Sequence, residues 1–360
     1  MPHVVIGYGE PLVEVRLSRP PRTMILDTPL QPGTLDTGVE TLIGGPSIGF
    51  SGDILNAINA AKHILAHHAA DNLTTLVTAV GDSNCDCSEH FIEWLATHKI
   101  DTRAIRRMRH GHMGAYVEGY RDNLGSFPYA RIGAAFEDLT QHHVTDVIKE
   151  YDTDSTGIIL SGITHARTNQ LHSLIDILEV AQQKRTVTFY CVNFRMSLWG
   201  KTARESTQKA RDSFRMIAEH LDFCSLGKDE AEIVLRSRIA NRSQAKRDAV
   251  KSILNMGIRC GVVLTGYPDA YIGFRDRGSV RIINHVADKT TPMGTNTTGA
   301  GDNFTGALAA LYLICRDIPV AFAGACQIAE SSTTVEGGIY HPRESEITEI
   351  ISGHHKRFDI

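Results

Sequence analysis

The sequence predicts an α/β protein built on a mainly parallel, doubly wound sheet. Short runs of β-branched residues alternate with longer stretches of helical periodicity, which is the pattern of successive βαβ units. The chain has 360 residues, of which 42% are hydrophobic and 22% charged, so it can bury a large core. It contains neither an internal repeat nor a low-complexity linker. We therefore expect one domain over residues 1–360.

The individual elements follow from these two periodicities. The short apolar runs predict strands at 4–6, 73–79, 157–160, 187–192, 223–225 and 262–264. The amphipathic stretches between them predict helices at 53–68, 86–97, 166–182, 205–219, 242–255, 303–315 and 319–333.

Two stretches interrupt the alternation. Residues 17–49 hold five of the 12 prolines together with several glycines, too irregular a composition for a core element. Residues 111–132 alternate in the manner of exposed antiparallel strands. We expect parts of 10–50 and 111–132 to form a small β lid over one edge of the sheet.

Composition excludes several classes of function. The formal net charge is −4 and no basic block is present, so nucleic acid is not an expected partner. No apolar run approaches the roughly 20 residues that span a bilayer, and the N-terminus lacks the pattern of an export signal. The seven cysteines are odd in number and scattered, as in reduced proteins. We expect a cytoplasmic protein without a membrane partner.

The most informative segment is Thr295–Ala307, in which a turn of small residues runs into an apolar-periodic helix. Gly299 and Gly301 allow the backbone to approach a phosphate, and the amides of a first helical turn form an anion-binding site. Asp302 lies at the start of this helix. It can be an N-cap, or a base that takes the proton of an attacking hydroxyl group, and the two roles are compatible. The segment is neither a Walker A loop nor a Rossmann fingerprint.

This segment resembles the C-terminal signature of the ribokinase-like, or PfkB, carbohydrate kinases. The segments 51–57 and 80–82 are similar to two further motifs of that family, the first of which binds sugar. The resemblance implies a ribokinase-like three-layer α/β/α sandwich, a sugar hydroxyl as phosphoryl acceptor, and ATP with Mg²⁺ as cofactors. It leaves open a homodimer formed through the lid.

Within the family, the sequence is most similar to the 2-keto-3-deoxygluconate kinases. Residues 9–13, 129–133, 160–164 and 193–199 carry this similarity. It implies that the sugar is bound by Gly52, Asp53, Asn56, Tyr116, Tyr129, Arg131, Ile163 and Arg195. A guanidinium offers a planar fork of donors that suits the carboxylate of a sugar acid.

The family resemblance also assigns the remaining site residues. It implies catalytic roles for Gly299, Ala300, Gly301 and Asp302, ATP binding by Thr265, Gly266, Thr298, Gly299 and Gly301, and metal binding by Glu230. The sequence departs from the family pattern at Ser51, Cys191, Gly227 and Asn296, where the family has glycine, aspartate, asparagine and aspartate. These departures bear on metal affinity and on the substrate.

We therefore expect a kinase that phosphorylates 2-keto-3-deoxygluconate with Asp302 as the base. A fructokinase or a 5-dehydro-2-deoxygluconate kinase is the alternative within the family. A sugar- or nucleotide-binding protein that has lost turnover is the alternative from another class, because the three departures at 191, 227 and 296 fall near the expected nucleotide and metal.

Overall fold

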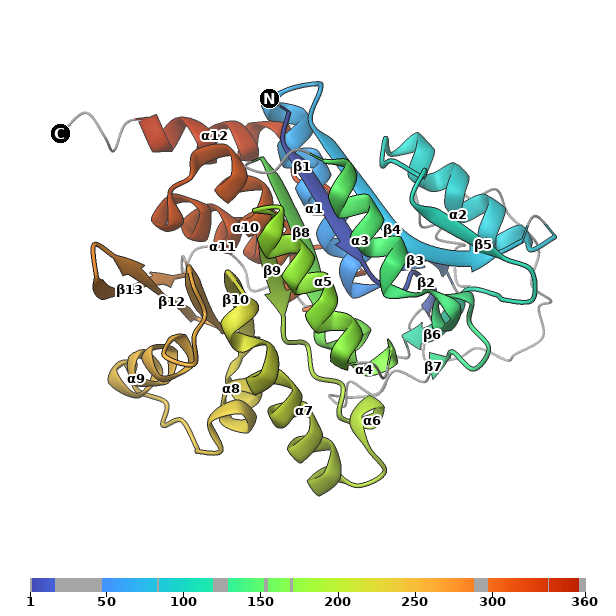
Figure 1. Ribbon diagram of the computed structural model, residues 1–360. Helices are drawn as coiled ribbons and strands as arrows, with labels where there is room; N and C mark the ends of the chain where they lie inside the picture. The colour runs from blue at the N-terminus through green and yellow to red at the C-terminus, as the bar shows by residue number, and fades with distance from the viewer. Residues whose placement is uncertain are drawn as a thin grey trace, which may run out of the picture.

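The computed structural model describes residues 2–16, 47–82, 84–118, 129–151, 155–168, 171–287, 297–335 and 337–355 (Figure 1). Its central sheet has nine strands in the order β13 (Ser279–Val286), β12 (Asp269–Asp276), β11 (Gly261–Thr265), β10 (Phe223–Gly227), β9 (Val187–Cys191), β8 (Thr156–Ser161), β1 (Val4–Tyr8), β4 (Leu73–Gly81) and β5 (Ile105–Met108). All neighbours from β11 to β5 pair in parallel, and β12 and β13 add an antiparallel edge. The predicted mainly parallel sheet is confirmed.

Both faces of this sheet are covered by helices, which gives three layers (Figure 1). In β8, Ile158 and Leu160 enter one apolar core while Ile159 enters the other, since successive strand residues point to opposite faces. One core is closed by α3 (Gln141–Glu150), α5 (Leu171–Gln183), α7 (Ala203–Ile217), α8 (Lys228–Leu235) and α9 (Ser243–Leu254). The other is closed by α1 (Asp53–His68), α2 (Asp86–Thr97), α10 (Ala300–Cys315), α11 (Ile318–Ser332) and α12 (Glu344–His355).

A second, smaller sheet lies at one edge of the molecule (Figure 1). Its strands are β3 (Ser47–Ser51), β2 (Leu12–Arg16), β6 (Gly114–Glu118) and β7 (Tyr129–Ala130), in that order. The expected lid is therefore present in the described parts of 10–50 and 111–132, although β6 pairs with β2 in parallel. Residues 17–46 and 119–128 lie outside the described residues. We call the four-stranded sheet the lid sheet; the dimer through it stays a prediction.

The close packing of α1 against α10 positions the site. A Cβ on Gly306 of α10 would overlap the backbone of Ala57 in α1, so glycine permits the two helices to approach. Their N-terminal turns consequently lie side by side, where Asn56 and Asp302 form a hydrogen bond.

Several elements differ from the sequence-based expectation. The stretch 166–182 is occupied by two helices, α4 (Gly162–Thr168) and α5. Helices α3, α6 (Met196–Trp199), α8 and α12, the strands β5, β12 and β13, and the 3₁₀ turn Ala135–Asp138 had no counterpart among the predicted elements, and the predicted helix 205–219 ends in the 3₁₀ turn Ala218–His220. No helix in the described part of the chain is long and apolar enough to cross a bilayer.

Candidate active site

A cavity of about 480 Å³ lies between the lid sheet and the C-terminal ends of the central strands. This is the end of a parallel sheet at which α/β proteins bind ligands. The predicted residues that line the cavity are Gly52, Asp53, Asn56, Tyr116, Arg131, Ile163, Arg195, Glu230, Thr265, Thr298, Gly299, Gly301 and Asp302. Ala300 and Gly266 adjoin lining residues without lining the cavity themselves, and the side chain of Tyr129 lies outside the described part of the chain.

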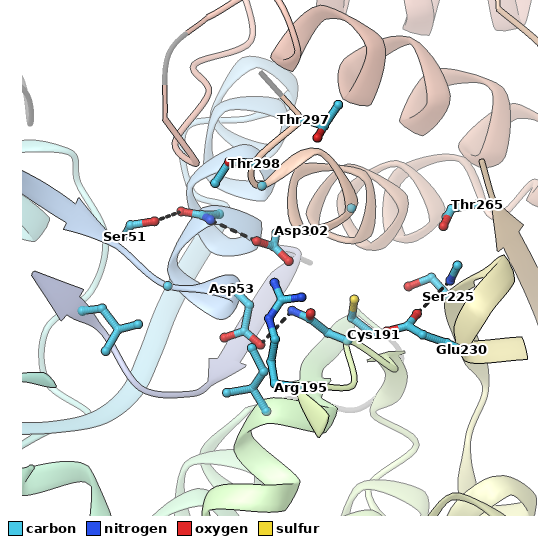
Figure 2. Close-up of a pocket in the computed structure, with 18 of the residues that line it drawn as sticks. Ser51, Asp53, Cys191, Arg195, Ser225, Glu230, Thr265, Thr297, Thr298 and Asp302 are labelled. Atoms are coloured by element: carbon cyan, nitrogen blue, oxygen red, sulfur yellow. Dashed lines mark hydrogen bonds between the residues drawn. The ribbon is translucent and has the colours of Figure 1, made fainter. Parts of the chain in front are cut away.

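Asp302 points into this cavity from the first turn of α10 (Figure 2). Asn56 Nδ2 donates to Asp302 Oδ2 at 3.0 Å, and Ser51 Oγ donates to Asn56 Oδ1 at 3.2 Å. The N-cap of α10 is Gly299, and no side chain caps the helix, so the interpretation of Asp302 as an N-cap is wrong. Its carboxylate is instead directed across the cavity toward α1.

The environment of Asp302 prepares it to accept a proton near neutral pH. Burial raises its pKa to about 7, and the negative charge of Asp53 adds to the rise. The hydrogen bond from Asn56 and the positive charge of Arg195 act in the opposite direction. A carboxylate with a pKa near the working pH is suited to general-base catalysis.

The turn before α10 has the conformation expected of an anion site. Gly299 has φ +76°, and a Cβ on it would come within 2.5 Å of Gly338 O, so glycine is required here twice over. Asn303 Nδ2 donates to Gly299 O and to Gly338 O, both at 2.9 Å. A Cβ on Gly301 would meet nothing within 4 Å, so the space in front of the first helical turn is open to a ligand.

The loop after β9 forms the opposite wall of the cavity. Asn193 has φ +33°, and its Nδ2 donates to Asp53 Oδ2 at 3.5 Å. Arg195 reaches into the same space, beside Asp53 (Figure 2). Its positive charge lowers the pKa values of Asp302 and Glu230, so its field extends over the catalytic end of the cavity.

The lid sheet and the residues that flank its strands contribute a second arginine and two acidic residues. Arg131 is only 6% exposed, and its Nε lies 3.3 Å from Glu10 Oε2. Tyr116 donates its hydroxyl hydrogen bond to Glu14, which also accepts one from Arg16. Glu10 and Glu14 are fully buried and were not predicted as site residues. In the sequence, the single charged residue Glu14 within the otherwise apolar stretch 11–15 could have indicated this part of the site.

Glu230 lines the cavity and holds two backbone segments. Its Oε1 accepts from Phe194 N at 2.7 Å and its Oε2 accepts from Gly227 N at 2.8 Å. Burial raises its pKa, which these two backbone hydrogen bonds oppose. Both oxygens are therefore engaged in holding the loop after β9 and the start of α8.

The described residues contain no cluster of three acidic, histidine or cysteine side chains placed to hold a metal ion. Cys191 lines the cavity, and burial raises its pKa well above its usual range, so it presents a neutral thiol rather than a charged ligand. Asn296 lies outside the described residues. A divalent cation would fit here only if it brought most of its oxygen ligands with it, as the phosphates of a nucleotide provide.

Comparison with known proteins decides the family. The model of the pfkB family carbohydrate kinases matches residues 40–345. The chain is a PfkB-family carbohydrate kinase. It is therefore a phosphotransferase that acts on a sugar hydroxyl group.

Solved structures of such kinases share its fold over almost the entire chain. The 2-dehydro-3-deoxygluconokinase of Thermotoga maritima is 18% identical, with a TM-score of 0.72, and the match covers 98% of this chain and 99% of that one. A putative ribokinase II of E. coli is 20% identical, with a TM-score of 0.71 and coverage of 98% and 100%. An ATP-bound fructokinase of Xylella fastidiosa is 14% identical, with a TM-score of 0.68 and coverage of 98% and 99%. The predicted ribokinase-like fold of this PfkB kinase is confirmed.

Proposed function

We propose that this kinase transfers the γ-phosphoryl group of ATP to the primary hydroxyl of a sugar acid, 2-keto-3-deoxygluconate. The observation that supports this substrate is the presence of two arginines, Arg131 and Arg195, in one cavity with Asp302. They come from different elements, the segment after β7 and the loop after β9. A carboxylate bound between two guanidinium groups would orient the sugar relative to the base.

The proposed step uses Asp302 as the general base. As the sugar oxygen forms its bond to the γ-phosphorus, the bond from that phosphorus to the β–γ bridging oxygen breaks, and Asp302 takes the hydroxyl proton. The amides of the Gly299–Gly301 turn would stabilise the charge on the transferring group. Mg²⁺, bound mainly by the nucleotide with Glu230 reached through water, would supply further neutralisation of phosphate charge.

One observation favours a neutral sugar as the second candidate. Arg131 already faces the buried carboxylate of Glu10, and Arg195 acts on a region that contains Asp53 and Asp302. These protein carboxylates offset the positive charge of the two arginines, so the cavity has less need of an anionic substrate and suits a neutral sugar such as fructose. The 5-dehydro-2-deoxygluconate kinase reaction remains a further alternative, and its substrate is again a sugar acid.

Substituting each arginine by lysine distinguishes the two candidates. Lysine keeps the positive charge and loses the planar fork, so Arg131→Lys and Arg195→Lys should each lower kcat/KM for 2-keto-3-deoxygluconate by about tenfold or more, since about 1.4 kcal/mol corresponds to a factor of ten. Turnover of fructose should change much less. Arg103→Lys is the control, because Arg103 lies on the surface in an ion pair with Asp101.

The measurement is a coupled ADP assay with both sugars on the wild type and the three variants. Equal losses on the two sugars, or a wild-type preference for fructose, would reject the sugar acid and leave the kinase activity intact. Failure to form sugar-dependent ADP with any of a panel of sugars and sugar acids would favour a binding protein without turnover.

A further inference from the structure

Arg16, the last residue of β2, leaves the lid sheet and reaches the turn that follows α11. Gly337 in this turn has φ +90°, and a Cβ on it would overlap the Arg16 guanidinium. The arginine therefore occupies the space in which a side chain at position 337 would begin. Its own side chain is only 13% exposed, so this is a buried contact between the lid sheet and the body of the molecule.

The same turn is attached to the phosphate-binding end of α10. Gly338 O accepts the hydrogen bond from Asn303 Nδ2, which also holds Gly299 O. A Cβ on Gly338 would lie 2.5 Å from Asn56 Nδ2, the group that donates to Asp302. The turn at 337–338 is thus enclosed between Arg16 on one side and the groups that position Gly299 and Asp302 on the other.

In the other direction, the contacts of Arg16 lead through Glu14 to Tyr116, which lines the cavity. Arg16 donates to Glu14 Oε2, and Tyr116 donates its hydroxyl to Glu14 Oε1. Glu14 is 1% exposed. Removing a hydrogen-bond donor from a buried carboxylate strongly destabilises the folded protein, so Glu14 holds Tyr116 and Arg16 in place. Tyr116 lines the cavity, whereas neither Glu14 nor Arg16 does.

We propose that Arg16 is a positioning residue that holds the lid sheet against the turn behind the proposed phosphate site, and we call this contact the latch. The latch is part of a chain of contacts that runs from Tyr116 through Glu14, Arg16 and Gly337–Gly338 to Asn303. A sugar that packs on Tyr116 fixes Glu14 and Arg16, and Arg16 fixes the turn that holds Gly299. Sugar binding and nucleotide binding are consequently coupled, with each strengthening the other. The coupling, unlike the latch itself, rests on the proposed kinase reaction.

The latch is tested without any ligand by amide hydrogen exchange. Arg16→Met removes the guanidinium and keeps an apolar stem of similar length. We expect peptides covering 299–306 and 337–347 to exchange at least about threefold faster than in the wild type, because the turn loses its lid contact. Arg103→Met is the matched control, since Arg103 also pairs with the acidic residue two positions before it, on a part of the surface away from the cavity. Unchanged exchange in these two peptides would overturn the latch.

The coupling is tested by the dissociation constant of a non-hydrolysable ATP analogue, measured with and without the sugar that the wild type phosphorylates. In the wild type, saturating sugar should tighten analogue binding by about fivefold or more, a typical coupling between two sites. In Arg16→Met the ratio should fall to within about twofold of 1, and Arg16→Lys should recover part of it. An unchanged ratio in Arg16→Met, or a ratio of 1 in the wild type, would overturn the coupling.

Hydrogen exchange and analogue binding together distinguish a failure of the latch from a failure of the proposed kinase reaction. If the wild type phosphorylates none of the sugars tested, the proposed function fails, and hydrogen exchange still decides the latch. Circular dichroism and thermal unfolding of Arg16→Met identify a variant that has failed to fold. In that event Tyr116→Phe, which removes only the hydroxyl donated to Glu14, is measured in its place with the same two criteria.

Discussion

Asp302 and Cys191 show how burial in one cavity has different consequences for two acids. Burial raises both pKa values. For the carboxyl group the new value, about 7, keeps an ionised fraction at physiological pH, whereas the thiol remains protonated. Asp302 therefore has the pKa that its proposed role as a base requires, and Cys191 contributes only a neutral surface.

The pKa of Asp302 predicts a pH dependence of activity. Because the base must be ionised, kcat/KM should be highest above pH 7 and fall tenfold per pH unit as the pH is lowered through about 7. Replacing Asp53 by Asn removes a negative charge that raises this pKa, so the acidic limb should move to lower pH.

Kinetics between pH 5 and 9 check this prediction, with Asp146→Asn as a control because Asp146 lies on the surface beside Lys149. Only the pH at which kcat/KM falls is compared, because Asp53 itself lines the cavity. A limb that stays in place in Asp53→Asn would show that another group titrates.

At the scale of elements, the site depends on how α10 and the turn at 337–338 are joined. Asn303 is fully buried and holds the carbonyl groups of Gly299 and Gly338 with one amide. In Asn303→Ala both carbonyls lose this donor, and we expect the free energy of unfolding to fall by about 1–3 kcal/mol. Gln244→Ala, which removes an exposed hydrogen bond to Asp248, should change it by less than about 0.5 kcal/mol. Urea unfolding of both variants measures the difference; equal effects would contradict the assigned role of Asn303.

The strands that the sequence predicted correctly are those that are buried on both faces of the central sheet. The six predicted strands are buried on both faces, and their sequences are mainly apolar, as is typical of strands in a parallel sheet. Strand β13 was missed because it lies at the sheet edge, and its exposed positions include the polar residues Ser279, Arg281 and Asn284. Helix α3 was missed because only Val144, Thr145 and Ile148 of its ten residues are buried, too few for a clear apolar period.

The site was predictable to the extent that it lies in local motifs. The turn and helix around Asp302 could be recognised from glycine spacing, because the backbone requirement is local. Glu14, Arg16 and Asn303 could not, because their partners Tyr116, Gly337 and Gly338 lie 102, 321 and 35 residues away from them in the sequence. The two oxygens of Glu230 were likewise predicted for a metal, whereas their backbone partners come from two separate loops.

For the molecule as a whole, the contact of α1 with α10 brings together the proposed sugar site and the proposed phosphate site. Gly306→Ala would place a methyl group against the backbone of Ala57, and neither helix can yield easily. We expect the free energy of unfolding to fall by about 1–3 kcal/mol. Gly301→Ala, in the same helix but facing open space, should leave stability unchanged or raise it by up to about 1 kcal/mol. Thermal unfolding of the two variants gives the comparison, and a similar loss in both would contradict the packing argument.

In the proposed reaction, Asp302 takes the proton of the sugar hydroxyl during phosphoryl transfer. Asp302→Asn retains the size of the side chain but cannot accept the proton. The measurement is kcat of Asp302→Asn with the sugar that the wild type phosphorylates, together with the dissociation constant of ATP. The account predicts a fall in kcat of about 10²–10⁴ with ATP affinity changed by less than about threefold. A variant that keeps near-wild-type kcat would contradict it.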